Sequence, residues 1–256
     1  MAVVVDVTSF ITASNASKEA YKTANLLKTL SVNALIMGDA GVGKKSLAKY
    51  ILPDASIIDA SEFDEILLTL KSSREIIISN LENSPNIKRI FDSISKNNTR
   101  VIATSNSSFS SEYTDELFSV KFSIPSLDER LEDISPLVEK FVHEASVLFG
   151  GDKNFSMDDF RPNLSQNSNS LRRQVMINYL LDDIKDVELM DIIQNYLFDK
   201  LGSNSDYRNF LYLYEVPLIR AGLNKFKSQL QLSDRLGLNR NTLRKKISEN
   251  EKYIKG

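Results

Sequence analysis

Cysteine is absent from this chain of 256 residues, and histidine occurs once, as His143. The absence of thiols excludes a disulfide framework and a thiolate metal site, and one imidazole cannot form a cluster of histidine ligands. No stretch approaches the roughly 20 apolar residues that span a bilayer. Residues 1–6 lack the basic start and apolar core of a signal peptide. We therefore expect a cytoplasmic protein without a membrane segment.

The acidic and basic residues are unevenly distributed. The net charge is −2, but the segment from Arg220 to Lys255 contains ten basic and three acidic residues. This segment therefore carries +7, and the rest of the chain carries −9. Lysine and arginine residues that neutralise phosphates supply most of the non-specific affinity for nucleic acids. The asymmetry thus favours a basic nucleic-acid-binding module on an acidic body.

A glycine-rich loop, residues 38–46 (GDAGVGKKS), follows the apolar run 34–37 and precedes the helix-like segment 47–51. This order approximates the pattern GxxxxGK(S/T), in which backbone N–H groups converge on phosphates and the lysine reaches the outer ones. The helix N-terminus adds affinity for anions. Lys45 stands where a hydroxyl normally holds Mg²⁺, and Ser46 comes one residue late. The candidate nucleotide ligands in this loop are Gly38, Gly41, Val42, Gly43, Lys44 and Lys45.

Strand-like and helix-like segments alternate around this loop. Since the first predicted helix starts at Ser17, we expect no sensory domain before it. Beyond Pro125 the strands give out, and only helical periodicity follows. The pattern predicts an α/β fold with a parallel sheet, then an all-α region. The predicted strands are 34–37, 56–59, 76–78 and 101–104, and the predicted helices are 17–30, 62–70, 87–95, 131–148, 171–184 and 188–201.

The C-terminal stretch 227–247 has the most specific pattern in the chain. Its leucines and isoleucine predict two short helices that meet at Gly237, as in a helix-turn-helix. The core residues that we expect are Leu230, Leu236, Leu238, Leu243 and Ile247. Asn239 is placed to cap the second helix, whose first residues would reach base edges in the major groove. The candidate DNA-binding residues are Asn239, Arg240, Asn241, Thr242, Arg244 and Lys245.

This stretch resembles the Fis-type helix-turn-helix that ends bacterial enhancer-binding proteins, the NtrC-like activators of sigma-54 RNA polymerase. Residues 215–218 match the start of that domain's helical core. The resemblance extends over nearly the whole chain, because residues 9–44 resemble the start of the family's AAA+ ATPase domain. The family's own glycine loop also lacks the hydroxyl and usually carries glutamate at the position of Lys45.

Three further segments resemble AAA+ motifs of the same family. Residues 101–109 resemble the sensor I strand, and 124–134 are similar to the signature that leads into the helical lid. Residues 169–175 resemble, more faintly, the sensor II motif. The resemblance implies that Asn106 is the sensor I residue and that Arg172 closes over the nucleotide.

The chain departs from this family at the groups that hydrolyse ATP. Ser79 and Asn80 replace the Asp-Glu pair at the end of a strand, and neither can act as a general base. Glu82 comes two positions late, so we expect it to point elsewhere. The family's arginine fingers, which contribute about 10³ to 10⁵ in rate in related systems, fall in the interval between Arg100 and Arg130, and this chain has no arginine there.

A third departure concerns the contact with polymerase. Sigma-54 activators use a glycine-bounded loop, GAFTGA, after the phosphate loop. This chain has no glycine between Gly43 and Gly150. We therefore expect no polymerase contact through such a loop.

These observations lead to one leading hypothesis. We expect an AAA+ P-loop parallel sheet in 1–124, a helical lid and linker in 125–202, and an all-α Fis-type helix-turn-helix domain in 203–256, with the turn-rich 202–205 as the last boundary. The function would be that of a sequence-specific, DNA-binding transcriptional regulator that binds ATP or ADP without hydrolysing it, with Mg²⁺ left open. Its partners would be double-stranded DNA and a second copy of the chain, paired through residues 210–226.

Two alternatives stay open, besides a vestigial loop that binds nothing. The chain could be a nucleotide switch or working ATPase that is anchored to DNA, which Gly41, Gly43 and Lys44 support. It could also be a non-catalytic AAA+ subunit that joins complete partners and modulates them.

Overall fold

The computed structural model describes residues 10–110, 114–151, 155, 157, 160–182 and 184–254. Ser9, at which the resemblance to an AAA+ domain begins, lies outside the described residues. The chain divides into two compact units, Met1–Asp183 and Ile184–Gly256. Within the described ranges, no helix is both long enough and apolar enough to cross a membrane.

The first unit contains a five-stranded sheet with the order β2-β3-β4-β1-β5. Every pair of neighbouring strands is parallel, which confirms the predicted α/β class and parallel sheet. β5 was not predicted, because Val120 and Phe122 alternate with Lys121 and Ser123 over four residues only. The strands are β1 (Ala34–Met37), β2 (Ile57–Asp59), β3 (Glu75–Ser79), β4 (Arg100–Ser105) and β5 (Val120–Ser123).

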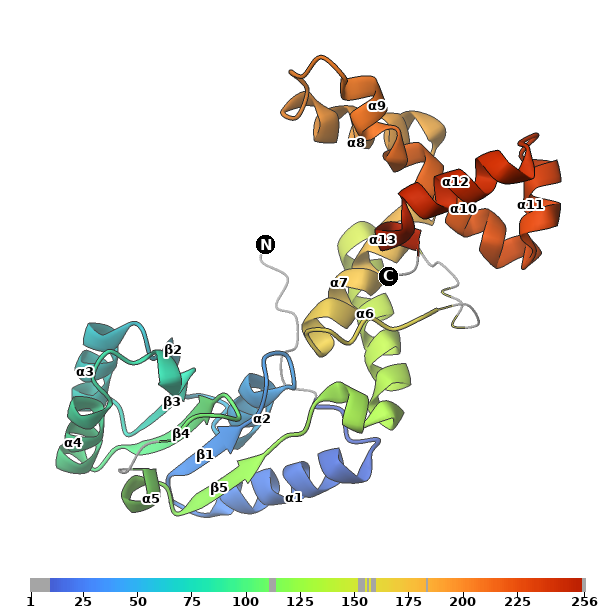
Figure 1. The fold of residues 1–256 in the computed structure, drawn as a ribbon. Helices are drawn as coiled ribbons and strands as arrows, with labels where there is room; N and C mark the ends of the chain where they lie inside the picture. Colours follow the sequence, from blue (N-terminus) through green and yellow to red (C-terminus); the bar gives the residue numbers. More distant parts are fainter. Residues whose placement is uncertain are drawn as a thin grey trace. The chain divides into compact units, whose positions relative to one another are not determined.

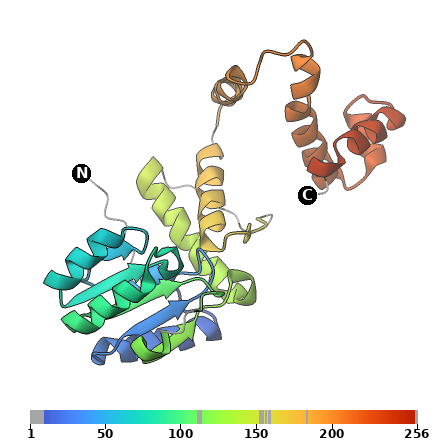
Figure 2. The same ribbon diagram turned by 60° about the vertical axis from the view of Figure 1, so that its left-hand side comes forward.

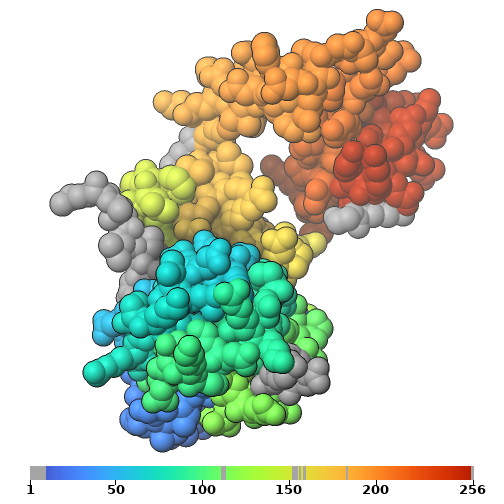
Figure 3. Space-filling model, turned by 90° about the vertical axis from the view of Figure 1, so that its left-hand side faces the viewer, coloured from blue at the N-terminus to red at the C-terminus, as the bar shows by residue number. Residues whose placement is uncertain are grey.

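Helices cover both faces of this sheet (Figure 1). Successive residues of a strand point to opposite faces, so Ile36 packs with α1 and α2 while Leu35 packs with α3 and α4. Figure 3 shows the face that α3 and α4 cover, in cyan and green. The helices around the sheet are α1 (Asn15–Thr29), α2 (Lys44–Ile51), α3 (Phe63–Ser72), α4 (Ile87–Asn97) and the short α5 (Thr114–Leu117).

Two longer helices, α6 (Ile134–Phe149) and α7 (Ser168–Leu181), complete the first unit. They lie side by side (Figure 1, Figure 2) and bury Val138, Phe141 and Val175 between them. These helices correspond to the predicted helical lid. Short 3-10 turns, η2 (Leu127–Glu129) and η3 (Leu131–Asp133), connect the sheet to α6.

The described part of the second unit is helical throughout. Its small hydrophobic core buries Ile219 of α10, Leu232 of α11 and Leu243 of α12. Leu230 was predicted to be a core residue, and this prediction is wrong, because Leu230 is 44% exposed while Leu232 packs against Gly222. The helices are α8 (Asp186–Phe198), α9 (Asp206–Phe210), α10 (Tyr212–Phe226), α11 (Gln229–Arg235), α12 (Arg240–Glu249) and α13 (Glu251–Ile254).

The second unit begins at Ile184, whereas the sequence suggested a boundary at residues 202–205. The polar residues there form a turn between α8 and α9. Asp206 accepts hydrogen bonds from the backbone N–H groups of Gly202 (2.7 Å) and Ser203 (3.0 Å), which fixes the turn. The glycine and serine residues thus form a turn inside the unit, between α8 and α9.

Candidate functional site

The phosphate loop has the backbone conformation that its glycines permit. Gly38, Gly41 and Gly43 all have positive φ angles, of 145°, 80° and 104°. At Gly41 a Cβ atom would also overlap the carbonyl oxygen of Gln166, so the loop and the segment before α7 approach each other too closely for any side chain. The loop is therefore shaped jointly by its own backbone and by the lid.

Lys44 lies at the first position of α2 and is 9% exposed. Its ammonium group donates hydrogen bonds to the carbonyl oxygens of Gly38 and Asp39, the latter at 2.9 Å. Burial lowers the pKa of Lys44, while the negative charges of Glu82 and Asp39 act in the opposite direction. The ammonium is thus held at the loop by neutral carbonyl groups, which phosphate oxygens could replace as stronger acceptors.

A polar cavity of about 370 Å³ opens over this loop. Two of the predicted ligands in the loop, Val42 and Gly38, are not among the described residues that line it. Val42 is buried in the core, and its carbonyl oxygen accepts a hydrogen bond from Arg130. Gly38 lies against the backbone of Ile124. The cavity is lined by Asp39, Ala40, Gly41, Gly43, Lys44, Lys45, Ser46, Asn80, Ser168 and Asn169.

The lid contributes residues that the sequence reading missed. Asn167 donates a hydrogen bond from Nδ2 to Ala40 O (2.9 Å) and accepts one from Leu127 N (2.6 Å). Ser168 donates from its backbone N–H (3.2 Å) and its hydroxyl (2.5 Å) to Gly41 O. The signal available in the sequence was the row of short polar residues just before the sensor II-like motif.

The two predicted sensor residues both contact residues that do not line this cavity. Arg172 is ion-paired with Glu144 of α6 at 2.7 Å, so its guanidinium is directed along the lid helices. Asn106 follows β4, and its side-chain oxygen accepts a hydrogen bond from Ser108 (3.1 Å). In the described part of the chain, neither residue lines the cavity. Their contact with a nucleotide stays a prediction.

Glu82 was expected to point away from the site, and among the described residues it does not line the cavity, although its charge acts on Lys44. Asn80 has a positive φ of 53° and starts the 3-10 helix η1 (Leu81–Asn83), which turns the chain back toward β4. Glu82 Oε1 accepts a hydrogen bond from Asn106 N (3.1 Å). Glu82 Oε2 is buried without a hydrogen-bond partner among the described residues. The turn at Asn80 thus places Glu82 against the backbone N–H of Asn106, just after β4.

Side chains at the carboxyl ends of β2 and β3, next to the loop, form a small hydrogen-bond network around Asp59. Its Oδ2 accepts hydrogen bonds from Asn80 Nδ2 (2.6 Å) and Ser79 Oγ (3.3 Å), and its Oδ1 accepts from Ser61 Oγ (2.7 Å). Burial raises the pKa of Asp59, but the hydrogen bonds from Ser61 and Asn80 and the charge of Lys45 outweigh this effect and lower it. Ser79 and Asn80 thus act as donors where the family has acids.

Arg130 and Asp133 form a buried ion pair at 3.0 Å in the signature before the lid. Arg130 Nη2 also donates to Val42 O (2.7 Å), and Asp133 Oδ1 accepts from Ala13 N (2.9 Å) and Ser14 N (2.8 Å). This pair therefore ties the phosphate loop and the N-terminal segment to the start of the lid. Sequence reasoning identified the signature but not this role.

The predicted DNA-binding residues gather at the start of α12 in the second unit. Asn239 caps the helix, because its side chain accepts a hydrogen bond from Asn241 N (2.8 Å). Leu243 is buried in the core and fixes the helix, while Lys246 pairs with Glu215 of α10. The residues left exposed are Asn239, Arg240, Asn241, Thr242, Arg244 and Lys245.

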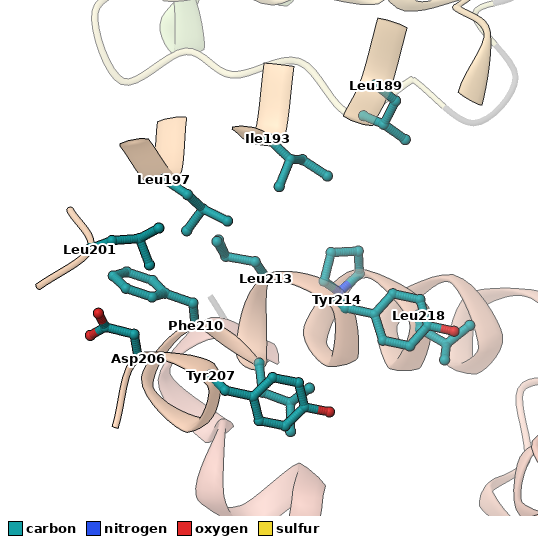
Figure 4. Close-up of a pocket in the computed structure, with 12 residues that line it drawn as sticks. Leu189, Ile193, Leu197, Leu201, Asp206, Tyr207, Phe210, Leu213, Tyr214 and Leu218 are labelled. Atoms are coloured by element: carbon teal, nitrogen blue, oxygen red, sulfur yellow. The ribbon is translucent and has the colours of Figure 1, made fainter. Parts of the chain in front are cut away.

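An apolar groove of about 580 Å³ lies between α8, α9 and α10 of the same unit. Ile193 and Leu197 extend from α8 toward Leu213 of α10 (Figure 4). No residue of α8, which is described in full, is buried. The apolar side chains of this helix are therefore left uncovered, as are Tyr207 (84% exposed) and Tyr214 (68% exposed).

Comparisons with known proteins identify the fold. No protein-family model matches the chain, and no curated protein matches it. The solved structure of NtrX from Brucella abortus in complex with ADP is similar, with a TM-score of 0.58 and 15% identity over 94% of this chain and 69% of that chain. NtrX in complex with ATP gives a TM-score of 0.56 and 16% identity over 95% and 70%. Together with the sheet order, this likeness confirms the predicted fold class, and the chain has the AAA+ α/β fold.

Proposed function

We propose that this chain is a sequence-specific, DNA-binding transcriptional regulator that binds ATP or ADP on an AAA+ scaffold without hydrolysing it. The observation that carries the proposal is the capped helix α12, which leaves Arg240, Asn241, Thr242, Arg244 and Lys245 exposed above a buried core. Arginine and asparagine can read guanine and adenine in the major groove of double-stranded DNA. Localised basic charge at this end of the chain supports the same partner.

Gel shifts over a range of salt concentrations test the DNA-binding part. Arg240→Ala and Arg244→Ala should each reduce the preference for a specific sequence, with a loss of about 1 to 3 kcal/mol if the side chain is bidentate to a base. Arg208→Ala is the matched control, because Arg208 is exposed on α9 outside the helix-turn-helix. Unchanged preference in both α12 variants would contradict the assignment of the recognition helix.

Nucleotide binding is supported by the cavity over the phosphate loop and by the buried Lys44. NtrX, which shares the fold, has been solved with ADP and with ATP. The absence of hydrolysis follows from Ser79 and Asn80 at the strand end and from the arginine-free interval between Arg100 and Arg130. We expect ADP binding that Lys44→Ala abolishes, and no release of phosphate from ATP above background. Phosphate release that Lys44→Ala removes would contradict this.

An active ATPase anchored to DNA is the second candidate, because Glu82 favours it. This carboxylate lies beside the backbone N–H of Asn106, and its charge acts on Lys44. A displaced acid could in principle serve as the general base for water. If it does so, Glu82→Gln abolishes phosphate release while ADP still binds. Under our leading proposal, the wild-type protein itself releases no phosphate from ATP, so Glu82→Gln changes nothing.

The DNA-binding form would be a homodimer, which the resemblance to Fis-type domains implies. The apolar groove between α8 and α10 and the uncovered side chains of α8 support pairing through this part of the second unit. The surface includes the predicted segment 210–226 and extends it to α8. Two copies of α12 would then read half-sites roughly 34 Å apart on one side of the DNA.

A further inference from the structure

The residues around the phosphate loop do not fit the Mg²⁺ ion that usually accompanies a nucleotide in P-loop proteins. That ion is held by a hydroxyl of the loop, by a carboxylate at a strand end and by phosphates. Here Lys45 stands at the hydroxyl position, and Ser79 and Asn80 end the strand. Across the described residues, no group of three or more histidine, cysteine, aspartate or glutamate side chains could hold a metal ion.

The two carboxylates at the neighbouring strand ends are already engaged. Both oxygens of Asp59 accept hydrogen bonds, from Asn80 at 2.6 Å and from Ser61 at 2.7 Å. Glu82 Oε1 accepts one from Asn106 N, while its Oε2 is buried without a hydrogen-bond partner among the described residues. In the part of the chain that the structure describes, neither carboxylate lines the cavity. A metal ion would have to displace these protein contacts and compete with the ammonium of Lys45.

Lys45 supplies a positive charge at the place that the ion would take. It lies in the first turn of α2, is exposed, and lines the cavity together with Lys44 and Asn80. Its charge reaches Asp59, where it helps the hydrogen bonds to overcome the effect of burial and to lower the pKa of that carboxyl group. A lysine ammonium has three donors and binds phosphate as a compact point charge.

We propose that this cavity binds the phosphates of ATP or ADP without a divalent cation, and that the ammonium of Lys45 takes the position of the metal and supplies one positive charge there. The inference rests on the proposed nucleotide binding and deepens it. Lys44 and Lys45 lie at the N-terminus of one helix, whose free N–H groups also favour anions. The two lysines and these N–H groups together provide enough hydrogen-bond donors and positive charge to bind the phosphates without a metal ion.

Calorimetric titration of the full chain with ADP, once with excess EDTA and once with excess Mg²⁺, tests this inference. We expect the two dissociation constants of the wild-type protein to agree within about threefold. Lys45→Ser, which restores the hydroxyl and removes the charge, should bind about 10-fold or more weakly in EDTA and should regain affinity with Mg²⁺. Lys96→Ser is the control. Lys96 is exposed at the C-terminal end of α4, which leads into β4. It therefore lies near the amino ends of the strands, whereas the glycine-rich loop follows the carboxyl end of β1.

The outcomes separate this inference from the proposal beneath it. Wild-type binding that occurs only with Mg²⁺ would overturn the role of Lys45 while leaving nucleotide binding intact. Equal affinities of the wild-type protein and Lys45→Ser in EDTA would overturn it as well. Absence of binding in both buffers would overturn nucleotide binding and cation independence together.

Discussion

Single buried side chains stabilise the first unit around its glycine-rich loop. Asp133 is fully buried, and it accepts hydrogen bonds from the hydroxyls of Ser14 and Ser17 as well as from backbone N–H groups. Its partner Arg130 is 3% exposed. A buried charge pair of this kind adds little net stability, because both charges lose their hydration. Removing only one member is strongly destabilising, because it leaves the other charge buried and unpaired.

Asp133→Ala should therefore lower the free energy of unfolding by about 3 to 5 kcal/mol, since it leaves Arg130 without its carboxylate. Urea unfolding followed by circular dichroism measures the loss. Glu19→Ala is the matched control, because it removes a carboxylate from the exposed pair with Lys22, and pairs of that kind contribute at most about 1 kcal/mol. Similar small losses in both variants would show that Asp133 does not anchor this unit.

The contact between the phosphate loop and the lid depends on a glycine. Gly41→Ala combines a strained positive φ with an overlap against Gln166, so it should push the lid segment off the loop. We expect ADP binding to weaken by about 1 to 3 kcal/mol, the usual cost of such strain. Gly150→Ala introduces a similar strain at a φ of 75° but meets nothing within 4 Å. Calorimetry with ADP should detect the loss in Gly41→Ala and not in Gly150→Ala.

At the scale of elements, the sequence predicts most helices and strands of the first unit. Apolar runs such as 76–78 and 101–104 identify buried parallel strands, because both faces of such strands are covered. The four-residue β5 has too little pattern to be found. The loop conformation follows from its glycines, and the capping of α12 follows from Asn239.

Other features could not be predicted because they depend on three-dimensional packing. Glu82 contacts the backbone N–H of Asn106 because Asn80 has a left-handed conformation, which no spacing rule reports. Asn167 and Ser168 meet the loop across more than a hundred residues of sequence. Leu230 and Leu232 are chemically equivalent, and only the close approach of α10 at Gly222 decides that Leu232 is buried.

At the scale of the whole molecule, we propose that two copies of the chain pair through the apolar groove of the second unit. Ile193→Asp puts a charge into the apolar groove of the second unit, so it should shift a dimer toward monomer. Leu68→Asp is the control, because Leu68 is 65% exposed on α3, outside the groove. Sedimentation velocity measures both variants. A monomeric wild-type protein, or a dimer that Ile193→Asp leaves intact, would contradict pairing through this surface.

The central claim is that this chain reads specific sequences in double-stranded DNA with α12. Genome-wide mapping of the DNA bound by the wild-type chain and by the Arg240→Ala, Arg244→Ala double variant tests it most directly. We predict localised wild-type sites that contain two half-sites about 34 Å apart, and the loss of these sites in the variant. Binding spread evenly over the genome, or sites that persist in the variant, would contradict the claim.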